Sequence, residues 1–300
     1  MQKEVWRLRK INDQCGRLRE KIFSNVCVLP SLIGVLIFFI IPFGIVVYYS
    51  VINNAVMQDF VGLENYKKLF TTVAFRRATL NTSVFTLISV PLAVVIPLLL
   101  AVVMERNIPG RSVFRTFFLS PLMVPTASVV LVWQVIFHNH GTLNQFMELF
   151  GISGVDWLRS SYGHIVIILM FLWKNTGYNM ILFMAALAAV PKDLLEVAEL
   201  EGAGKLYQFF HIKLRYLSPT IIFVIILSLI NSFKIFREVY LLTGDYPYKL
   251  YMLQHFMNNT FNSFDYQKLS SAAVLLSLVM IVVIAVLLAA DNFFGKDLEN

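Results

Sequence analysis

Long apolar blocks separated by short charged segments dominate this chain. The first block runs from residue 26 to 52, and no charged residue lies between Lys21 and Asp59. Five more blocks lie at residues 77–105, 115–138, 163–190, 217–242 and 268–291. A helix needs about 20 residues to cross the hydrocarbon core, so each block predicts one transmembrane helix. The alternating ten-residue segments typical of membrane strands do not occur. The pattern therefore predicts an all-α integral membrane protein with six transmembrane helices.

An amphipathic segment at residues 191–219 interrupts this apolar pattern between the fourth and fifth blocks. Pro191 suits the first position of a helix, and Asp193 favours its first turn, where the helix dipole attracts acids. The three small residues at 202–204 predict a bend, and a second helix then places Leu206, Phe209, Phe210 and Leu214 on one face. Two interpretations stay open: a helix lying on the lipid surface, or a docking element for a groove on a soluble partner.

Composition excludes an ordinary soluble domain. Hydrophobic residues make up 58% of the chain and charged residues 14%, against about 45–50% and about 25% in soluble domains. The two cysteines, Cys15 and Cys27, are too few for a disulfide framework, and the five histidines have no metal-ligand spacing. The sequence EGAGKL at 201–206 lacks the spacing of a phosphate-binding loop. We therefore expect no catalytic residue, metal ligand or bound cofactor in this chain.

The distribution of basic residues predicts the topology. The net charge is +7, and seven Lys and Arg residues lie in the first 25 positions, a pattern that fits anionic lipid better than nucleic acid. With both termini inside, the inner segments, including 191–219, carry about twice as many basic residues as the outer ones. No cleavage site follows the first apolar block, which we expect to be retained as a helix. The prediction is N-in, C-in.

Polar residues inside the apolar blocks are the candidates for a substrate pathway, because such groups are costly in a membrane. They are Trp133, Lys174, Asn175, Tyr178, Asn179, Asn231, Lys234 and Glu238. Amides and aromatic rings together suit carbohydrate recognition. The alternatives are that the amides join helices by hydrogen bonds, and that the lysines extend to the interface, pair with Glu238 or form an external gate.

The segment 191–219 resembles the EAA loop of bacterial ABC importer permeases, whose pattern is E-A-A, three residues, G, nine residues, I, one residue, L-P. The matching positions are Glu196, Ala198, Gly202, Ile212 and Leu214, whereas Val197 and Arg215 depart from the pattern. FVGLENY at 60–66 and RSVFRTFFLSPLMVP at 111–125 further resemble sugar-type permeases related to the maltose system. SFKIFREVYLLTG at 232–244 is also similar, although that family more often has Asp near Arg237.

The resemblance implies a type I ABC importer transmembrane domain in a bacterial cytoplasmic membrane. The implied organisation is a basic cytoplasmic segment 1–25, a first helix 26–52, a transmembrane domain 76–290 with the coupling loop 191–219, and a cytoplasmic tail 291–300. The coupling residues would be Glu196, Ala198, Gly202, Ala203, Leu206, Phe209, Ile212 and Leu214. Partners would be a second permease, an ATPase dimer that holds ATP and Mg²⁺, and an extracytoplasmic binding protein.

The substrate implied by the resemblance is a sugar or oligosaccharide. Glycerol phosphate, an amino acid or an ion remain alternative substrates for the same class of importer. An integral membrane enzyme would need clustered acids, a histidine pair or a nucleophile at membrane depth. A secondary transporter would work without any ATPase and would leave the segment 191–219 unexplained.

Overall fold

The computed structural model describes residues 28–54, 56–105, 109–160, 162–243 and 248–295, with backbone alone at 248 and 291–295. The basic segment 1–25 and the end of the tail therefore lie outside the described residues. The chain divides into two compact units. One comprises the chain up to Lys67 together with Tyr266–Val274, and the other comprises Lys68–Asp265 with the residues from Leu275 onward. The described residues form helices and no strands.

In the first unit, an apolar helix covers Val28–Ser50 and includes the π-helical turn η1 (Leu36–Ile40) and α2 (Ile41–Ser50). The motif FVGLENY explains how α2 ends. Asn65 Nδ2 donates hydrogen bonds to the carbonyl oxygens of Ser50 (3.0 Å) and Ile52 (2.8 Å), and Asn65 is buried. These carbonyls belong to a helix end that has no intrahelical donors left. Asn65 also lies at the start of α3 (Glu64–Thr71), so this contact fixes the turn between the two helices.

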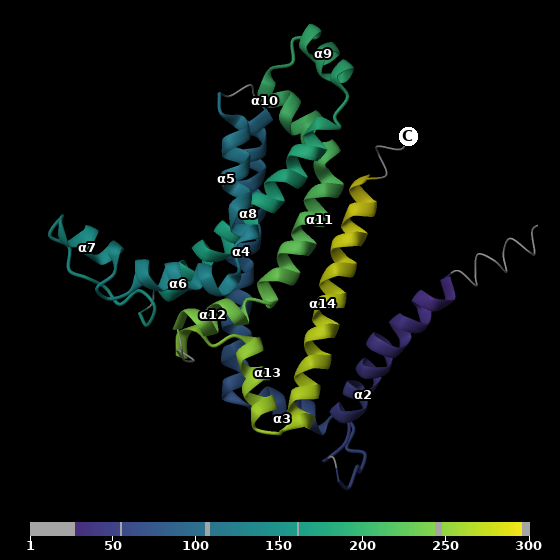
Figure 1. Ribbon diagram of the computed structural model, residues 1–300. Helices are drawn as coiled ribbons and strands as arrows, with labels where there is room; N and C mark the ends of the chain where they lie inside the picture. The colour runs from purple at the N-terminus through teal and green to yellow at the C-terminus, as the bar shows by residue number, and fades with distance from the viewer. Residues whose placement is uncertain (1–27, 55, 106–108, 161, 244–247, 296–300) are drawn as a thin grey trace, which may run out of the picture. The chain divides into compact units, whose positions relative to one another are not determined.

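Three long helices in the second unit pack side by side (Figure 1): α4 (Val73–Glu105), α8 (Gly163–Ala188) and α11 (Leu214–Phe233). Two buried apolar clusters lie among them. One includes Phe85 of α4, whose ring meets that of Phe171 of α8 edge-on at 5.4 Å. The other includes Phe183 and Leu217. The fourth predicted helix is confirmed by α8, and the second corresponds to α4.

The third predicted helix is not continuous, and this prediction is wrong. Two helices occupy the block, α5 (Arg111–Met123) and α6 (Thr126–Phe137), and α7 (Thr142–Glu148) follows. The chain bends by 103° between α5 and the helices after it. Pro125 is the physical cause, because a proline pushes the residue before it out of the helical region, and Val124 is extended at φ −88°, ψ 130°.

The fifth predicted helix begins earlier and ends sooner than expected. After α9 (Lys192–Leu200), α10 (Lys205–Gln208), the π-helical turn η2 (Phe209–Lys213) and α11 run on as one helix from Lys205 to Phe233. The chain then breaks at Lys234, and α12 (Phe236–Thr243) follows. Pro219 therefore lies inside this helix.

The remaining elements are η3 (Tyr248–Leu250), α13 (Leu253–Asn262) and α14 (Tyr266–Gly295). Within the described residues, five helices are long and apolar enough to cross a membrane, or six if the bent pair α5–α6 counts as one span. The nearly all-helical membrane fold is thus as predicted. The N-in, C-in orientation stays a prediction.

Candidate functional site

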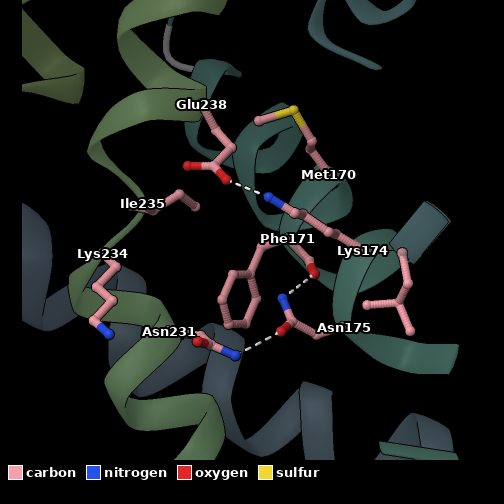
Figure 2. Close-up of a pocket in the computed structure, with 9 residues that line it drawn as sticks. Met170, Phe171, Lys174, Asn175, Asn231, Lys234, Ile235 and Glu238 are labelled. Atoms are coloured by element: carbon pink, nitrogen blue, oxygen red, sulfur yellow. Dashed lines mark hydrogen bonds and ion pairs between the residues drawn. The ribbon is translucent and has the colours of Figure 1, made fainter. Parts of the chain in front are cut away.

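A cavity of about 300 Å³ lies between α8 and the region where α11 gives way to α12. Figure 2 shows its polar side chains, and its walls are Leu122, Met170, Phe171, Lys174, Asn175, Asn231, Lys234, Ile235 and Glu238. The break at Lys234 lets α11 and α12 each contribute residues to it. Five of the eight residues predicted for a substrate pathway therefore lie around one space.

An ion pair crosses the cavity from α8 to α12. Lys174 Nζ lies 2.5 Å from Glu238 Oε1, and the two side chains point toward each other in Figure 2. Lys174 Nζ also donates to Thr126 Oγ1 at 3.1 Å. Thr126 is the first residue of α6, so the 103° bend of the third block brings this hydroxyl to the lysine. Sequence analysis missed Thr126, because its place depends on that bend.

An amide pair forms the second polar part of the cavity. Asn231 Nδ2 of α11 donates to Asn175 Oδ1 of α8 at 3.0 Å (Figure 2). Asn175 Nδ2 in turn donates to the carbonyl of Phe171, one turn back, at 2.8 Å. The second Nδ2 hydrogen and the Oδ1 atom of Asn231 take part in neither bond. A carboxamide with both a donor and an acceptor to spare can bind a sugar hydroxyl, which is itself donor and acceptor.

Three predicted pathway residues are not among the lining residues of this cavity. Trp133 stacks on Phe137 with ring centres 5.3 Å apart and packs on a buried apolar cluster. Tyr178 is 44% exposed on α8. Asn179 is 2% exposed and hydrogen-bonds the carbonyl of Ala93 on α4. Asn175 lines the cavity and Asn179 is buried against α4, although the two lie four residues apart on α8. Spacing along a helix therefore does not decide which polar residues line a cavity and which pack between helices.

The turn of the predicted coupling loop follows a specific helix-ending motif. Gly202 has φ +85°, a conformation that favours glycine, and its N–H donates to the carbonyl of Glu199. The N–H of Ala203 donates to the carbonyl of Ala198 at 2.8 Å. Together these bonds form the Schellman motif, which satisfies carbonyls at the end of α9. The predicted bend at 202–204 is therefore confirmed. Of its two glycines, only Gly202 has a backbone conformation that favours glycine.

The loop presents a mostly exposed apolar surface. Leu200, Leu206 and Phe210 are 88%, 76% and 59% exposed, and Glu196 is exposed as well. Phe209 is half-buried, whereas Ile212 packs against the cluster of Phe183 and Leu217. The sequence left open which apolar residues face outward. The structure divides them, with Leu206 and Phe210 outward and Ile212 inward.

An ion pair fastens the loop to the end of α4. Lys213 Nζ of η2 lies 2.6 Å from Glu105 Oε1 and 2.8 Å from Glu105 Oε2. The two residues are 108 positions apart in the sequence, so no local pattern predicted their pairing. The contact connects the beginning of the fifth helix to the last residue of the second.

A buried histidine supports the segment that follows α12. His255 of α13 is completely buried, its Nδ1 accepts a hydrogen bond from the N–H of Met252, and its ring lies edge-on to Phe236 at 4.8 Å. Burial lowers the pKa of His255 from 6.5 to about 4. Burial of the charged imidazolium is unfavourable, so the ring of His255 stays neutral in the first turn of α13.

We expect the stability conferred by His255 to be present above pH 6.5 and lost as the pH falls toward about 4. In that window the unfolded chain binds a proton that the folded chain does not. The shift corresponds to about 3 kcal/mol. His255→Gln keeps an acceptor at the same helix position but cannot titrate. Melting temperatures of both proteins from pH 8 to 4.5 should diverge as the pH falls, and parallel curves would contradict the assignment.

Comparison with known protein families gives a match over most of the chain. The family described as the binding-protein-dependent transport system inner membrane component matches residues 93–300. The trehalose/maltose transport system permease protein MalF of Thermococcus litoralis is 31% identical over 77% of this chain and 80% of its own length. The sn-glycerol-3-phosphate transport system permease protein UgpA of Pectobacterium atrosepticum is 29% identical over 72% and 74%.

Solved structures show the same fold. A chain of a bacterial ABC transporter involved in the import of the acidic polysaccharide alginate superposes with a TM-score of 0.80 at 20% identity, covering 94% of this chain and 98% of its own. A chain of the alginate transporter in complex with its alginate pentasaccharide-bound periplasmic protein gives 0.80 as well, with coverages of 93% and 96%. The bend at Pro125 and the break at Lys234 therefore lie within a fold that these transporters share.

Proposed function

The chain belongs to the inner membrane components of binding-protein-dependent transport systems, and from this premise we propose that its cavity conducts a sugar or short oligosaccharide. The protein is an ABC importer permease subunit. The observation that carries the substrate proposal is the amide pair of Asn175 and Asn231, which leaves donor and acceptor atoms beside a cavity lined by Phe171. Hydroxyl groups of a sugar match such atoms, and the apolar wall suits the faces of its ring.

Paired charge in the cavity favours a neutral substrate. Lys174 and Glu238 neutralise each other at 2.5 Å, so neither presents a full charge to a solute. The trehalose/maltose permease among the relatives is named for a neutral sugar, which supports this choice.

A second candidate substrate is an anionic sugar derivative or glycerol phosphate. The observation that favours it is Lys234, which is exposed and adds a further cation to the cavity lining. One relative is named for sn-glycerol-3-phosphate transport. Loss of phosphorylated-solute uptake in Lys234→Met, with no measurable uptake of neutral sugars by the native protein, would favour this candidate.

The exposed loop surface is the proposed docking site for an ATPase partner. Leu206 and Phe210 offer apolar groups, and Glu196 offers a charge for a basic group on the partner. ATP and Mg²⁺ would bind that partner and not this chain. A second permease and an extracytoplasmic binding protein complete the proposed assembly in a bacterial cytoplasmic membrane, with the N- and C-termini inside.

The cavity proposal predicts that Asn231→Leu lowers uptake of the transported sugar. Loss of a hydrogen bond to the substrate costs about 1–1.5 kcal/mol, which corresponds to about tenfold in affinity. The measurement is uptake of labelled oligosaccharides into vesicles that contain the assembled transporter, with ATP inside and binding protein outside. Lys268→Leu is the control: it also replaces a polar side chain with leucine, but Lys268 does not line the cavity. Normal uptake by Asn231→Leu across a panel of sugars would exclude the cavity as the pathway.

A further inference from the structure

A proline inside a helix leaves one carbonyl without its usual donor. The N–H of residue 97 would donate to the carbonyl of residue 93 in α4, but Pro97 has no N–H. Both residues are buried: Ala93 is completely inaccessible and Pro97 faces the same interior. A buried carbonyl without a hydrogen bond is destabilising, and more so at membrane depth, where water does not replace the missing donor.

Asn179 supplies the missing donor from another helix. Its Nδ2 donates to the carbonyl of Ala93 at 2.8 Å and to Ser228 Oγ of α11 at 3.2 Å. Asn179 is 2% exposed and Ser228 1%, so these bonds are shielded from solvent. One side chain of α8 therefore joins the carbonyl that Pro97 leaves free on α4 to α11.

The arrangement differs from that at Pro121 in α5. There the carbonyl released by the proline belongs to Phe117, and Ser120 of the same helix donates to it at 2.8 Å. The hydrogen bond at Pro121 therefore stays within α5 and does not join α5 to another helix. The carbonyl released by Pro97 is instead used by a different helix, so the proline creates an acceptor for an interhelical bond.

We propose that Asn179 is a positioning residue that fastens α4, α8 and α11 to one another through the carbonyl that Pro97 releases. The three helices then move as one body when the cavity changes its access. Thr86 of α4 and Ser232 of α11 add a second buried tie, with their hydroxyl oxygens 3.0 Å apart. On this assignment Asn179 supports the cavity residues on α8, four residues from Asn175, and does not contact the substrate.

The test is rescue by a second substitution. Asn179→Leu keeps the size of the side chain and removes the donor, and we expect the apparent melting temperature of the purified permease to fall by about 5 °C. Adding Pro97→Ala restores an N–H within α4 that can donate to the carbonyl of Ala93. The double variant should regain most of the lost stability, or its expression if Asn179→Leu alone does not accumulate.

Pro91→Ala in the Asn179→Leu background is the matched control. Pro91 lies in the same helix, but its restored N–H faces the carbonyl of Leu87 and not that of Ala93. Rescue by Pro97→Ala and none by Pro91→Ala supports the proposal. Equal rescue by both prolines, or rescue by neither, overturns it.

Transport gives an independent readout, and this arm rests on the proposed function. A positioning role predicts a severalfold lower maximal rate of uptake in Asn179→Leu with an unchanged KM. A higher KM that Pro97→Ala does not restore would instead place Asn179 in contact with substrate and would overturn the proposal. The stability arm needs no substrate, so a wrong assignment of the sugar and a wrong assignment of Asn179 give different results.

Discussion

Replacing Gly202 with valine is expected to abolish substrate uptake and release the ATPase. Gly202 has φ +85°, where a side chain costs about 1–2 kcal/mol and a β-branched one more. A change of about 2 kcal/mol in docking corresponds to about thirtyfold in affinity. The Schellman turn would rearrange and change the position of the exposed Leu206 relative to α9. The measurement is copurification of the ATPase with the permease, together with uptake.

Gly204→Val is the matched control, because it puts the same side chain into the same turn. Gly204 has φ −64°, ψ 158°, which any residue adopts. An added Cβ meets no atom within 4 Å at either glycine, so the two positions differ in backbone conformation and not in local space. ATPase binding should survive far better in Gly204→Val. Full ATPase binding and uptake in Gly202→Val would show that this turn does not position a docking surface.

Gly177→Ala is expected to prevent normal packing of α5 on α8. A Cβ at this position would lie 1.9 Å from the carbonyl oxygen of Phe118, closer than atoms can approach. The obstacle is backbone, so a change of rotamer cannot relieve it. Separating two packed helices to admit a methyl group costs about 1–3 kcal/mol, and small residues at helix crossings in membranes are the basis of their close approach.

The amount of monodisperse permease after detergent extraction checks this prediction. Gly44→Ala is the control, since Gly44 also lies within an apolar helix but an added Cβ there meets no atom of the chain within 4 Å. We expect a large loss of folded protein for Gly177→Ala and little change for Gly44→Ala. Equal yields would mean that α5 and α8 do not cross at this glycine.

Sequence pattern predicted the helices well where length and apolar content alone decide them, as in α4, α8 and α14. The bend between α5 and α6 had a local signal in Pro125, but nine apolar residues follow it within the same block, and the length criterion outweighed the proline. Asn175 and Asn179 are four residues apart, a spacing that places both on one face of a helix. Their partners, Asn231 and the carbonyl of Ala93, lie on different helices, so only tertiary packing separates cavity from core.

The continuous helix from Lys205 to Phe233 connects the loop to the cavity region. Its 29 residues span roughly 43 Å at 1.5 Å per residue, with the loop turn at one end and the break at Lys234, beside the cavity, at the other. The contact of Lys213 with Glu105 near the loop end, and the bond of Asn179 to Ser228 farther along, hold this helix to its neighbours α4 and α8. A displacement of the loop end would therefore be carried to the cavity region by the three helices together, over that whole length.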